Sequence, residues 1–143
     1  MDEIDQTLLS ALAANARTSV SDLARQLGLA RTTIQARIER LERQGHIAGY
    51  TLRPGPASAQ GRIRATALLQ VEPRATPQVL SRLGAMPAVT RVHTSSGRFD
   101  MIVEITAPDT ANLDAQLDQI GSITGIVRSE SLIQLTTKID RPF

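Results

Sequence analysis

The spacing of the apolar residues changes at a segment rich in proline and glycine, RPGPASAQG. Before this segment, apolar residues recur every three or four positions, which is the pattern of a helix with one buried face. After it they alternate with polar residues, which is the pattern of a half-buried strand. Clustered proline, glycine and small residues are typical of a linker. The sequence therefore predicts a helical domain at residues 1–53, a linker at 54–61 and a strand-containing domain at 62–143.

Three helices are predicted in the first domain, followed by a short strand over residues 46–52. Ser19 or Ser21 is placed to cap the second helix, which we expect to end at Gly28. We expect the third helix to end before Gly45. The apolar residues that define the inner faces of the helices are Ile4, Leu8, Leu9 and Leu12, then Val20, Leu23, Ala24 and Leu27, then Ile34, Ile38 and Leu41.

The second domain shows the order strand, helix, strand, strand, helix, strand. Its first strand alternates from Ile63 to Val71, and Thr76 and Asp109 are expected to cap the two helices. The later strands are expected at 88–94, 99–106 and 129–139. In the last strand, Ile133, Leu135 and Thr137 alternate with Gln134, Thr136 and Lys138. This order predicts the ferredoxin-like βαββαβ fold of the α+β class, an antiparallel sheet with two helices on one face. The other face must be covered, and a second copy of the chain is the simplest cover.

Positive charge is concentrated in the first domain. The whole chain has a net charge of +2, but residues 17–53 contain seven arginines and only three acidic residues. Residues 1–16, by contrast, contain three acidic residues and no basic one. A basic surplus within one short segment indicates a polyanionic partner.

The segment VSDLARQLGLARTTIQARIERLERQGHI has the spacing of a helix-turn-helix, with its turn at Gly28 and Leu29. The first turn of the second helix would face a DNA major groove, where arginine and glutamine pair with base edges and threonine offers a hydroxyl and a methyl group. Arginines further along suit phosphates. The candidate base-reading residues are Arg31, Thr32, Thr33 and Gln35, and the candidate phosphate-binding residues are Arg37, Arg40 and Arg43.

The alternative for this segment is a plain three-helix bundle whose arginines face solvent, some of them paired with Glu39 or Glu42. Arg37 separates the two interpretations. The residues three and four positions after it, Arg40 and Leu41, offer no carboxylate within the helix. We therefore expect Arg37 to contact a DNA phosphate.

The composition argues against several other classes of protein. The chain has no cysteine, which excludes disulfides and thiolate zinc sites. It lacks an apolar run of ~20 residues and has an acidic amino terminus, so we expect a cytoplasmic protein with no membrane partner. His46 and His93 fall in different domains, and a GxGxxG loop is absent. We therefore expect no catalytic residue, no metal and no cofactor. A ferredoxin-like enzyme, or an effector-binding or assembly module that does not bind DNA, is the alternative.

A polar turn precedes the third strand of the second domain, in TSSGRFDMIVEI. Gly97 permits a tight turn there. Phe99 and Asp100 come next, and we expect them to face opposite sides of the strand. On the residues alone, the simpler interpretation is a hairpin tip in which Asp100 caps a backbone amide and Phe99 packs under the sheet.

Several motifs together resemble one family of regulators. The motifs are Asp2-x-x-Asp5-x-x-x-Leu9, Leu23-Ala24, Gly28-Leu29, Arg37-Ile38-x-x-Leu41-Glu42, Gln44-Gly45-His46-Ile47-x-Gly49-Tyr50 and Ser96-Gly97-x-Phe99-Asp100. In these the chain resembles the Lrp/AsnC, or feast/famine, family of bacterial and archaeal transcription regulators over nearly its whole length.

Two departures from the family pattern concern the first domain. Ala30 and Arg31 stand where the family usually has serine and proline before its recognition helix, which leaves Thr32 or Thr33 as the alternative cap. His46 replaces a residue that is usually apolar.

The resemblance implies a winged helix-turn-helix that binds double-stranded DNA. It implies a second domain that dimerises through its sheet and assembles dimers further, often to octamers. It also implies a small effector, usually an amino acid, that alters assembly or DNA affinity. Asp100 suits the ammonium of such an effector, and the loop amides suit its carboxylate. The candidate effector-binding residues are Ser96, Gly97, Arg98, Phe99 and Asp100 in the loop and Ser129 and Ser131 in the last strand.

Overall fold

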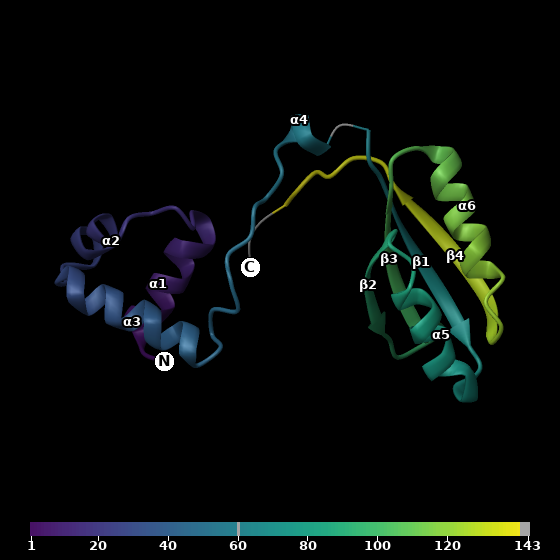
Figure 1. Ribbon diagram of the computed structural model, residues 1–143, viewed down its shortest axis with the longest axis horizontal. Coiled ribbons are helices and arrows are strands. Elements are labelled where there is room, and N and C mark those ends of the chain that lie inside the picture. The colour runs from purple at the N-terminus through teal and green to yellow at the C-terminus, as the bar shows by residue number, and fades with distance from the viewer. Residues whose placement is uncertain (60, 141–143) are drawn as a thin grey trace. The chain divides into compact units, whose positions relative to one another are not determined.

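The computed structural model describes residues 1–59 and 61–140, which form two compact units (Figure 1). The first unit spans Met1–Arg53 and takes in Ile139 and Asp140, and the second spans Pro54–Lys138. Each unit has a hydrophobic core of its own. Among the described residues, none of the helices has the length and apolar character needed to cross a membrane.

Three α-helices make up the first unit: α1 (Glu3–Ala14), α2 (Val20–Leu27) and α3 (Arg31–Arg43). Their buried side chains come from the predicted inner faces and pack into one core. The buried residues of this core are Leu8, Leu12, Leu23, Ala24, Ile34 and Ile38.

The ends of α1 and α2 are set by local chemistry. Asp2 caps α1 and Ser19 caps α2, each by accepting a hydrogen bond from the backbone N–H three residues later. Gly28 ends α2 with a φ of 64°, a left-handed conformation that glycine adopts without steric cost. The chain can therefore turn sharply into α3, as the helix-turn-helix spacing predicts.

The start of α3 has no side-chain cap. Ala30 is the N-cap, and no side chain makes a capping hydrogen bond. Because the helix already begins at Arg31, neither Thr32 nor Thr33 caps it, so the alternative that one of them does is wrong. Both threonines stay on the exposed side of the helix.

Residues 46–52 form no strand, contrary to the prediction, so they do not supply a wing. The backbone N–H groups of His46 and Ile47 donate to the carbonyl oxygen of Leu41, at 2.9 and 3.2 Å, and close the end of α3. A strand needs a hydrogen-bonded neighbour. The predicted linker contains a single-turn helix, α4 (Pro56–Ala59).

A four-stranded antiparallel sheet and two long helices form the second unit. The strands are β1 (Ile63–Val71), β2 (Val89–Thr94), β3 (Met101–Ala107) and β4 (Ile126–Gln134). The helices are the short 3-10 helix η1 (Pro73–Ala75), α5 (Thr76–Gly84) and α6 (Thr110–Gly121). The strand order is β2-β3-β1-β4, with every neighbouring pair antiparallel. The predicted ferredoxin-like fold and α+β class are confirmed.

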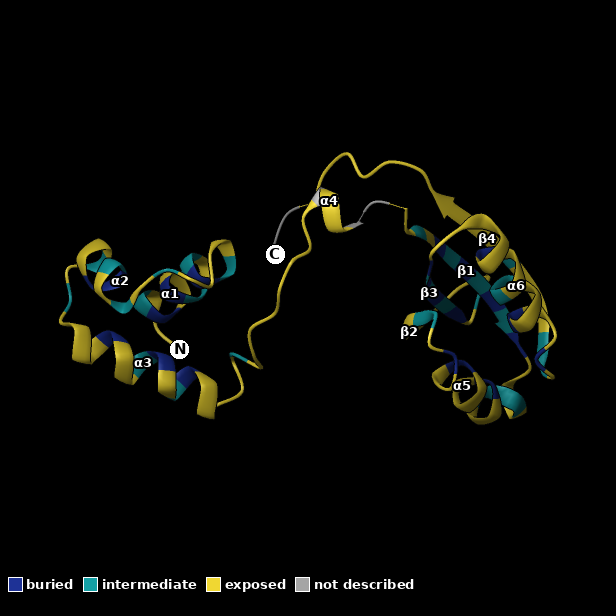
Figure 2. Cartoon of the chain, turned by 45° about the horizontal axis from the view of Figure 1, so that its top comes forward, coloured by how far each residue is buried: buried dark blue, intermediate teal, exposed yellow. Residues whose placement is uncertain are grey.

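Both long helices cover the same face of this sheet. Along β1 the residues at odd positions from Ala65 to Val71 are buried, whereas those between them are half-buried on the other face. The buried side chains pack with Leu83 of α5 and Leu113 of α6. Figure 2 shows the buried parts of β1 and β3 on the side of the sheet that α5 and α6 cover. The half-buried face is the one that the sequence predicts to need a cover.

Several boundaries in the second unit differ from prediction: β3 begins at Met101 and not at 99, and β4 begins at Ile126 and not at 129. β4 ends at Gln134, opposite Arg64 of β1, because its pairing with β1 stops there. Ile133 lies opposite the buried Ala65 but is 53% exposed, and Leu135, which follows the end of β4, is 93% exposed. Thr76 is the first residue of α5 and makes no capping bond. The predicted cap of α6 by Asp109 is confirmed.

A glycine turn between α6 and β4 packs closely against the start of α5. Gly125 has a φ of 102°, and its carbonyl oxygen accepts a hydrogen bond from the N–H of Glu72 at 2.9 Å. A Cβ atom at this position would overlap the Cβ of Ala75 and lie 3.5 Å from Cγ2 of Val79. The turn therefore requires glycine for its backbone conformation and for space.

Candidate DNA interface and effector loop

The side of α3 opposite the core carries a shallow hollow. The buried residues of α3 are Ile34, Ile38 and Leu41. The residues that line the hollow lie on the other side of the helix and are Thr32, Thr33, Ala36, Arg37, Arg40 and Arg43. Hydroxyl, methyl and guanidinium groups are thus gathered on one face of a helix that begins after a tight turn, which suits a DNA groove and its phosphates.

The structure gathers most of the predicted DNA-binding residues on this face, with two exceptions. Arg31 and Gln35 are exposed but do not line the hollow. Gln35 Nε2 donates to Glu39 Oε1 at 3.0 Å, so this side chain lies along the helix. Ala36 was missed by the sequence analysis, because alanine offers no polar group. Its position, four residues after Thr32, is what places it on this face.

Two carboxylates at the start of α1 bind each other's backbone. The N–H of Asp5 donates to Asp2 Oδ1 at 2.9 Å, and the N–H of Asp2 donates to Asp5 Oδ2 at 3.0 Å. This reciprocal arrangement is a capping box, here made by two aspartates. Asp5 is 1% exposed, which is unusual for a carboxylate unless it is paired.

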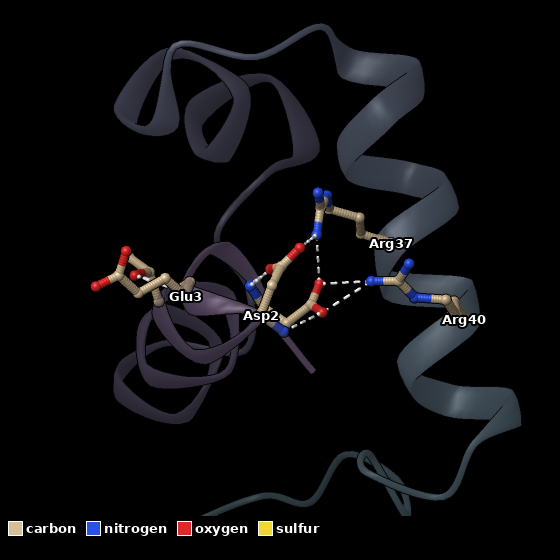
Figure 3. A network of polar contacts seen from close by, with 6 residues as sticks. Asp2, Glu3, Arg37 and Arg40 are labelled. Carbon is tan, nitrogen blue, oxygen red and sulfur yellow. Dashed lines mark hydrogen bonds and ion pairs between the residues drawn. The ribbon is translucent and has the colours of Figure 1, made fainter.

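Two arginines of α3 provide that pairing (Figure 3). Arg37 Nη1 lies 2.7 Å from Asp2 Oδ2 and 2.8 Å from Asp5 Oδ1. Arg40 Nη2 lies 2.9 and 2.8 Å from the two carboxylate oxygens of Asp5. We call these four residues, Asp2, Asp5, Arg37 and Arg40, the carboxylate clamp. It joins the first turn of α1 to the middle of α3.

Hydrogen bonds to the clamp carboxylates favour their ionised form. The N–H of Asp2 and the guanidinium groups of Arg37 and Arg40 lower the pKa of Asp5 to about 2. The pKa of Asp2 is lowered by Arg37 and by the N–H of Asp5. Asp2 and Asp5 in turn raise the pKa of Arg37. Four full charges of balanced sign are therefore held together at neutral pH.

The clamp changes the interpretation of Arg37. Within its own helix Arg37 has no carboxylate partner, as the sequence indicates, but α1 supplies two. Arg37 is 20% exposed and Arg40 is 43% exposed, whereas Arg43 is 70% exposed and lies 4.0 Å from its nearest carboxylate, Glu39. Arg43 is thus the least restrained arginine of the hollow.

In the second unit, Asp100 is tied to the end of β1. Its backbone N–H donates to the carbonyl oxygen of Leu69, and its Oδ2 accepts from the N–H of Val71, both at 2.8 Å. The pairing of β1 with β3 ends at Leu69 and Met101, which leaves the N–H of Val71 without a strand partner on that side. The predicted capping of a backbone amide by Asp100 is confirmed.

Arg98 lies over the neighbouring aromatic ring and reaches toward β4. Its Cζ is 4.9 Å from the ring centroid of Phe99, and its Nη2 is 3.5 Å from Glu130 Oε2. Gln70 Nε2 donates to the Arg98 carbonyl oxygen at 2.7 Å, and Arg128 pairs with Glu130 at 2.8 Å. Gln70 and Glu130 were missed by the sequence analysis. In the sequence, only their alternation with inward-facing neighbours indicated that both side chains lie on the open face of the sheet.

The seven predicted effector residues do not gather on one side of the sheet within one chain. Ser129 and Ser131 lie opposite Leu69 and Ala67, residues whose side chains face the helices. Glu130, the partner of Arg98, lies opposite Leu68 on the other face. Directly opposed residues share a face, so the two serines and the Arg98 guanidinium lie on different sides.

Residues 1–42 match the AsnC-type helix-turn-helix domain, and residues 64–142 match the Lrp/AsnC ligand-binding domain. The chain belongs to the Lrp/AsnC family. As a family member it is a transcriptional regulator that combines a helix-turn-helix with a ligand-binding domain. The resemblance in the sequence motifs is thereby confirmed for both halves of the chain.

Named relatives are similar over nearly their whole length. The regulator LysM of Saccharolobus solfataricus is 32% identical over 138 residues, covering 96% of this chain and 95% of the relative. The regulator FL11 of Pyrococcus furiosus is 30% identical over 135 residues, covering 94% of this chain and 89% of the relative. Both are named HTH-type transcriptional regulators, and neither name denotes an enzyme.

Solved structures of this family share the fold. E. coli AsnC has a TM-score of 0.89 and 26% identity, covering 100% of this chain and 97% of that one. A Neisseria meningitidis regulator solved as a complex with L-methionine has a TM-score of 0.89 and 19% identity, covering 99% of this chain and 94% of that one. At that identity the likeness concerns the fold alone.

Proposed function

We propose that this Lrp/AsnC protein is a sequence-specific DNA-binding regulator whose DNA affinity or assembly responds to a small amino acid. It acts by binding and not by catalysis. The observation that carries the proposal is the exposed threonine and arginine face of α3, presented directly after the left-handed turn at Gly28. That face has the groups that read base edges and the charges that hold phosphates.

Exposure and chemistry assign the roles on this face. Thr32 and Thr33 are exposed, carry a hydroxyl and a methyl group each, and are assigned to base edges. Arg31 and Gln35 are exposed outside this face and are proposed as further base contacts. Arg43 is assigned to a phosphate because its guanidinium is the least restrained. Arg37 and Arg40 reach the same hollow with the N–H groups that the clamp does not use.

A homodimer formed through the open sheet face fits the second unit. Leu68 and Ile102 on this face are half-buried, and Leu132 is 55% exposed. Covering their apolar surface with a second copy removes it from water and lowers the free energy of the dimer. Two helix-turn-helix units would then contact half-sites about 34 Å apart, which raises the affinity beyond that of one unit. Light scattering on the fragment 62–143 tests this, and a monomer at high concentration would contradict it. Assembly of dimers to octamers is proposed from the family resemblance.

The effector is assigned to the loop around Asp100. One carboxylate oxygen of Asp100 accepts a hydrogen bond from the N–H of Val71. Among the described residues the other oxygen has no hydrogen-bond donor, so this oxygen suits an ammonium group. The amides of Gly97 and Arg98 suit a carboxylate. Two further observations support an amino acid: the match to the Lrp/AsnC ligand-binding domain and the shared fold with the regulator bound to L-methionine. Because Ser129 and Ser131 lie on the other face from Arg98, they would meet an effector from a neighbouring copy.

A gel shift with the DNA upstream of the chain's own reading frame tests the DNA-binding part of the proposal. A retarded band that survives competition by unrelated DNA is expected. Absence of any shift at low salt would favour an effector-binding or assembly module without DNA. Calorimetry against the twenty amino acids tests the effector separately, and we expect an apolar one such as leucine or methionine to bind below millimolar concentration.

A further inference from the structure

The carboxylate clamp opposes indiscriminate binding to DNA phosphates. We propose that Asp2 and Asp5 neutralise and immobilise Arg37 and Arg40, so that affinity for random-sequence DNA stays low and the preference for a specific site is larger. This inference rests on the proposed DNA-binding face of α3 and adds to it a role for the first turn of α1.

Asp5 is fully occupied within the clamp. Its Oδ1 accepts from Arg37 and Arg40, and its Oδ2 accepts from Arg40 and the N–H of Asp2, all at 2.8 to 3.0 Å. Charge-assisted hydrogen bonds of this kind are among the strong ones in proteins, and they fix geometry as well as charge. The two guanidinium groups are therefore held in one arrangement before any DNA arrives.

A DNA phosphate would have to compete with a buried carboxylate for these arginines. Asp5 is 1% exposed, so an arginine that left it for DNA would leave a buried carboxylate with fewer hydrogen bonds and only one cationic partner. Removing one partner of a buried ion pair is strongly unfavourable. Arg37 and Arg40 can therefore offer DNA only the N–H groups that remain free, and only where the phosphates suit their fixed positions.

The clamp also lowers the net charge that DNA meets at this part of α3. Affinity for random DNA depends on how many phosphates lysine and arginine neutralise, and each contributes about 0.9 to the slope of log affinity against log salt concentration. The two carboxylates cancel the positive charge of the two arginines, so these arginines neutralise fewer DNA phosphates. A specific site regains contacts through base edges and geometry, so neutralisation weakens random binding more than specific binding.

The test compares carboxamide variants of the full chain. Asp5→Asn removes the carboxylate partner of Arg40 and one of the two carboxylate partners of Arg37, and Asp2→Asn, at a half-exposed position, removes the other partner of Arg37. Glu3→Gln is the matched control, because it removes one negative charge from the same turn at a side chain directed away from Arg37 and Arg40 (Figure 3). Circular dichroism confirms folding, and if Asp5→Asn does not fold, Asp2→Asn carries the test.

Fluorescence anisotropy with a random-sequence duplex and a selected-site duplex, each across a salt series, gives the readout. We expect both aspartate variants to bind random DNA more tightly, with a salt slope steeper by about 0.9 per phosphate gained, and to lose part of their preference for the selected site. Slopes equal to that of Glu3→Gln overturn the inference. So does weaker binding with a shallower slope, which would mean that the carboxylates orient the arginines for phosphates. Absence of DNA binding by the wild type would overturn the proposed function itself, and the inference with it.

Discussion

Replacement of Gly125 by alanine is expected to destabilise the second unit by about 2–6 kcal/mol. Two costs contribute. The φ of 102° is unfavourable for any residue with a Cβ atom, which costs on the order of 1–3 kcal/mol. The new Cβ would also overlap that of Ala75, and overpacking of this kind costs about 1–3 kcal/mol. The sum is a large fraction of the roughly 5–15 kcal/mol that stabilises a typical domain.

Two comparisons separate these costs. Gly97 has a φ of 115°, and a Cβ atom there would have nothing within 4 Å, so Gly97→Ala carries the backbone cost alone. Adding Ala75→Gly to Gly125→Ala removes the overlapping atom, after which the nearest atoms lie at 3.5 Å and beyond. We expect the double variant to recover about 1–3 kcal/mol relative to Gly125→Ala, beyond the effect of Ala75→Gly alone.

Urea unfolding followed by far-ultraviolet circular dichroism measures these differences, since the chain contains no tryptophan. The protein concentration must be the same for every variant, because self-association adds to apparent stability. If Gly125→Ala costs no more than Gly97→Ala, or if Ala75→Gly recovers nothing, the close packing of this turn against the start of α5 does not limit stability.

Arg43→Ala is expected to lower the salt slope of DNA binding by about 0.9 for each phosphate that the variant no longer neutralises. Arg37→Ala should lower this slope by less, because Arg37 belongs to the clamp and Arg43 does not, and equal reductions in a salt titration would refute this. Asp100→Ala is expected to abolish the calorimetric signal of the bound amino acid while DNA binding persists, and unchanged amino-acid binding would leave Asp100 with its capping role alone. Because the pKa of Asp5 is about 2 in the folded protein and about 3.9 when unfolded, its stabilising contribution should be complete above about pH 5 and lost as the pH falls to about 2 and below. Asp5→Asn should flatten this part of the unfolding profile, and an unchanged profile would exclude Asp5 as its source.

The sequence was sufficient wherever a local pattern and the final packing required the same residues. The faces of the first three helices, the alternation along β1 and the turn at Gly28 are of this kind, because helical and strand periods report directly which side is buried. Asp109 and Ser19 cap helices through bonds only three residues long, so they too were predictable.

The sequence was insufficient where the outcome depends on a distant partner. Residues 46–52 have the composition of a strand but no neighbour to pair with, and β4 ends where its pairing with β1 ends, although the alternation continues to Leu135. The ion pairs of the clamp also depend on a distant partner. Asp5 lies 32 residues from Arg37, and no period within either helix relates the two positions.

The clamp also constrains how the DNA preference of this protein can change during evolution. Arg37 and Arg40 share a buried carboxylate, so a neutral substitution at either position leaves the clamp with one more negative than positive charge and favours a compensating change in α1. Substitutions at Thr32 and Ala36 need no compensating change, since both residues are exposed and lie outside the core. Lineages that acquire new operators are therefore expected to vary first at these two positions, with the arginines changing only together with the aspartates.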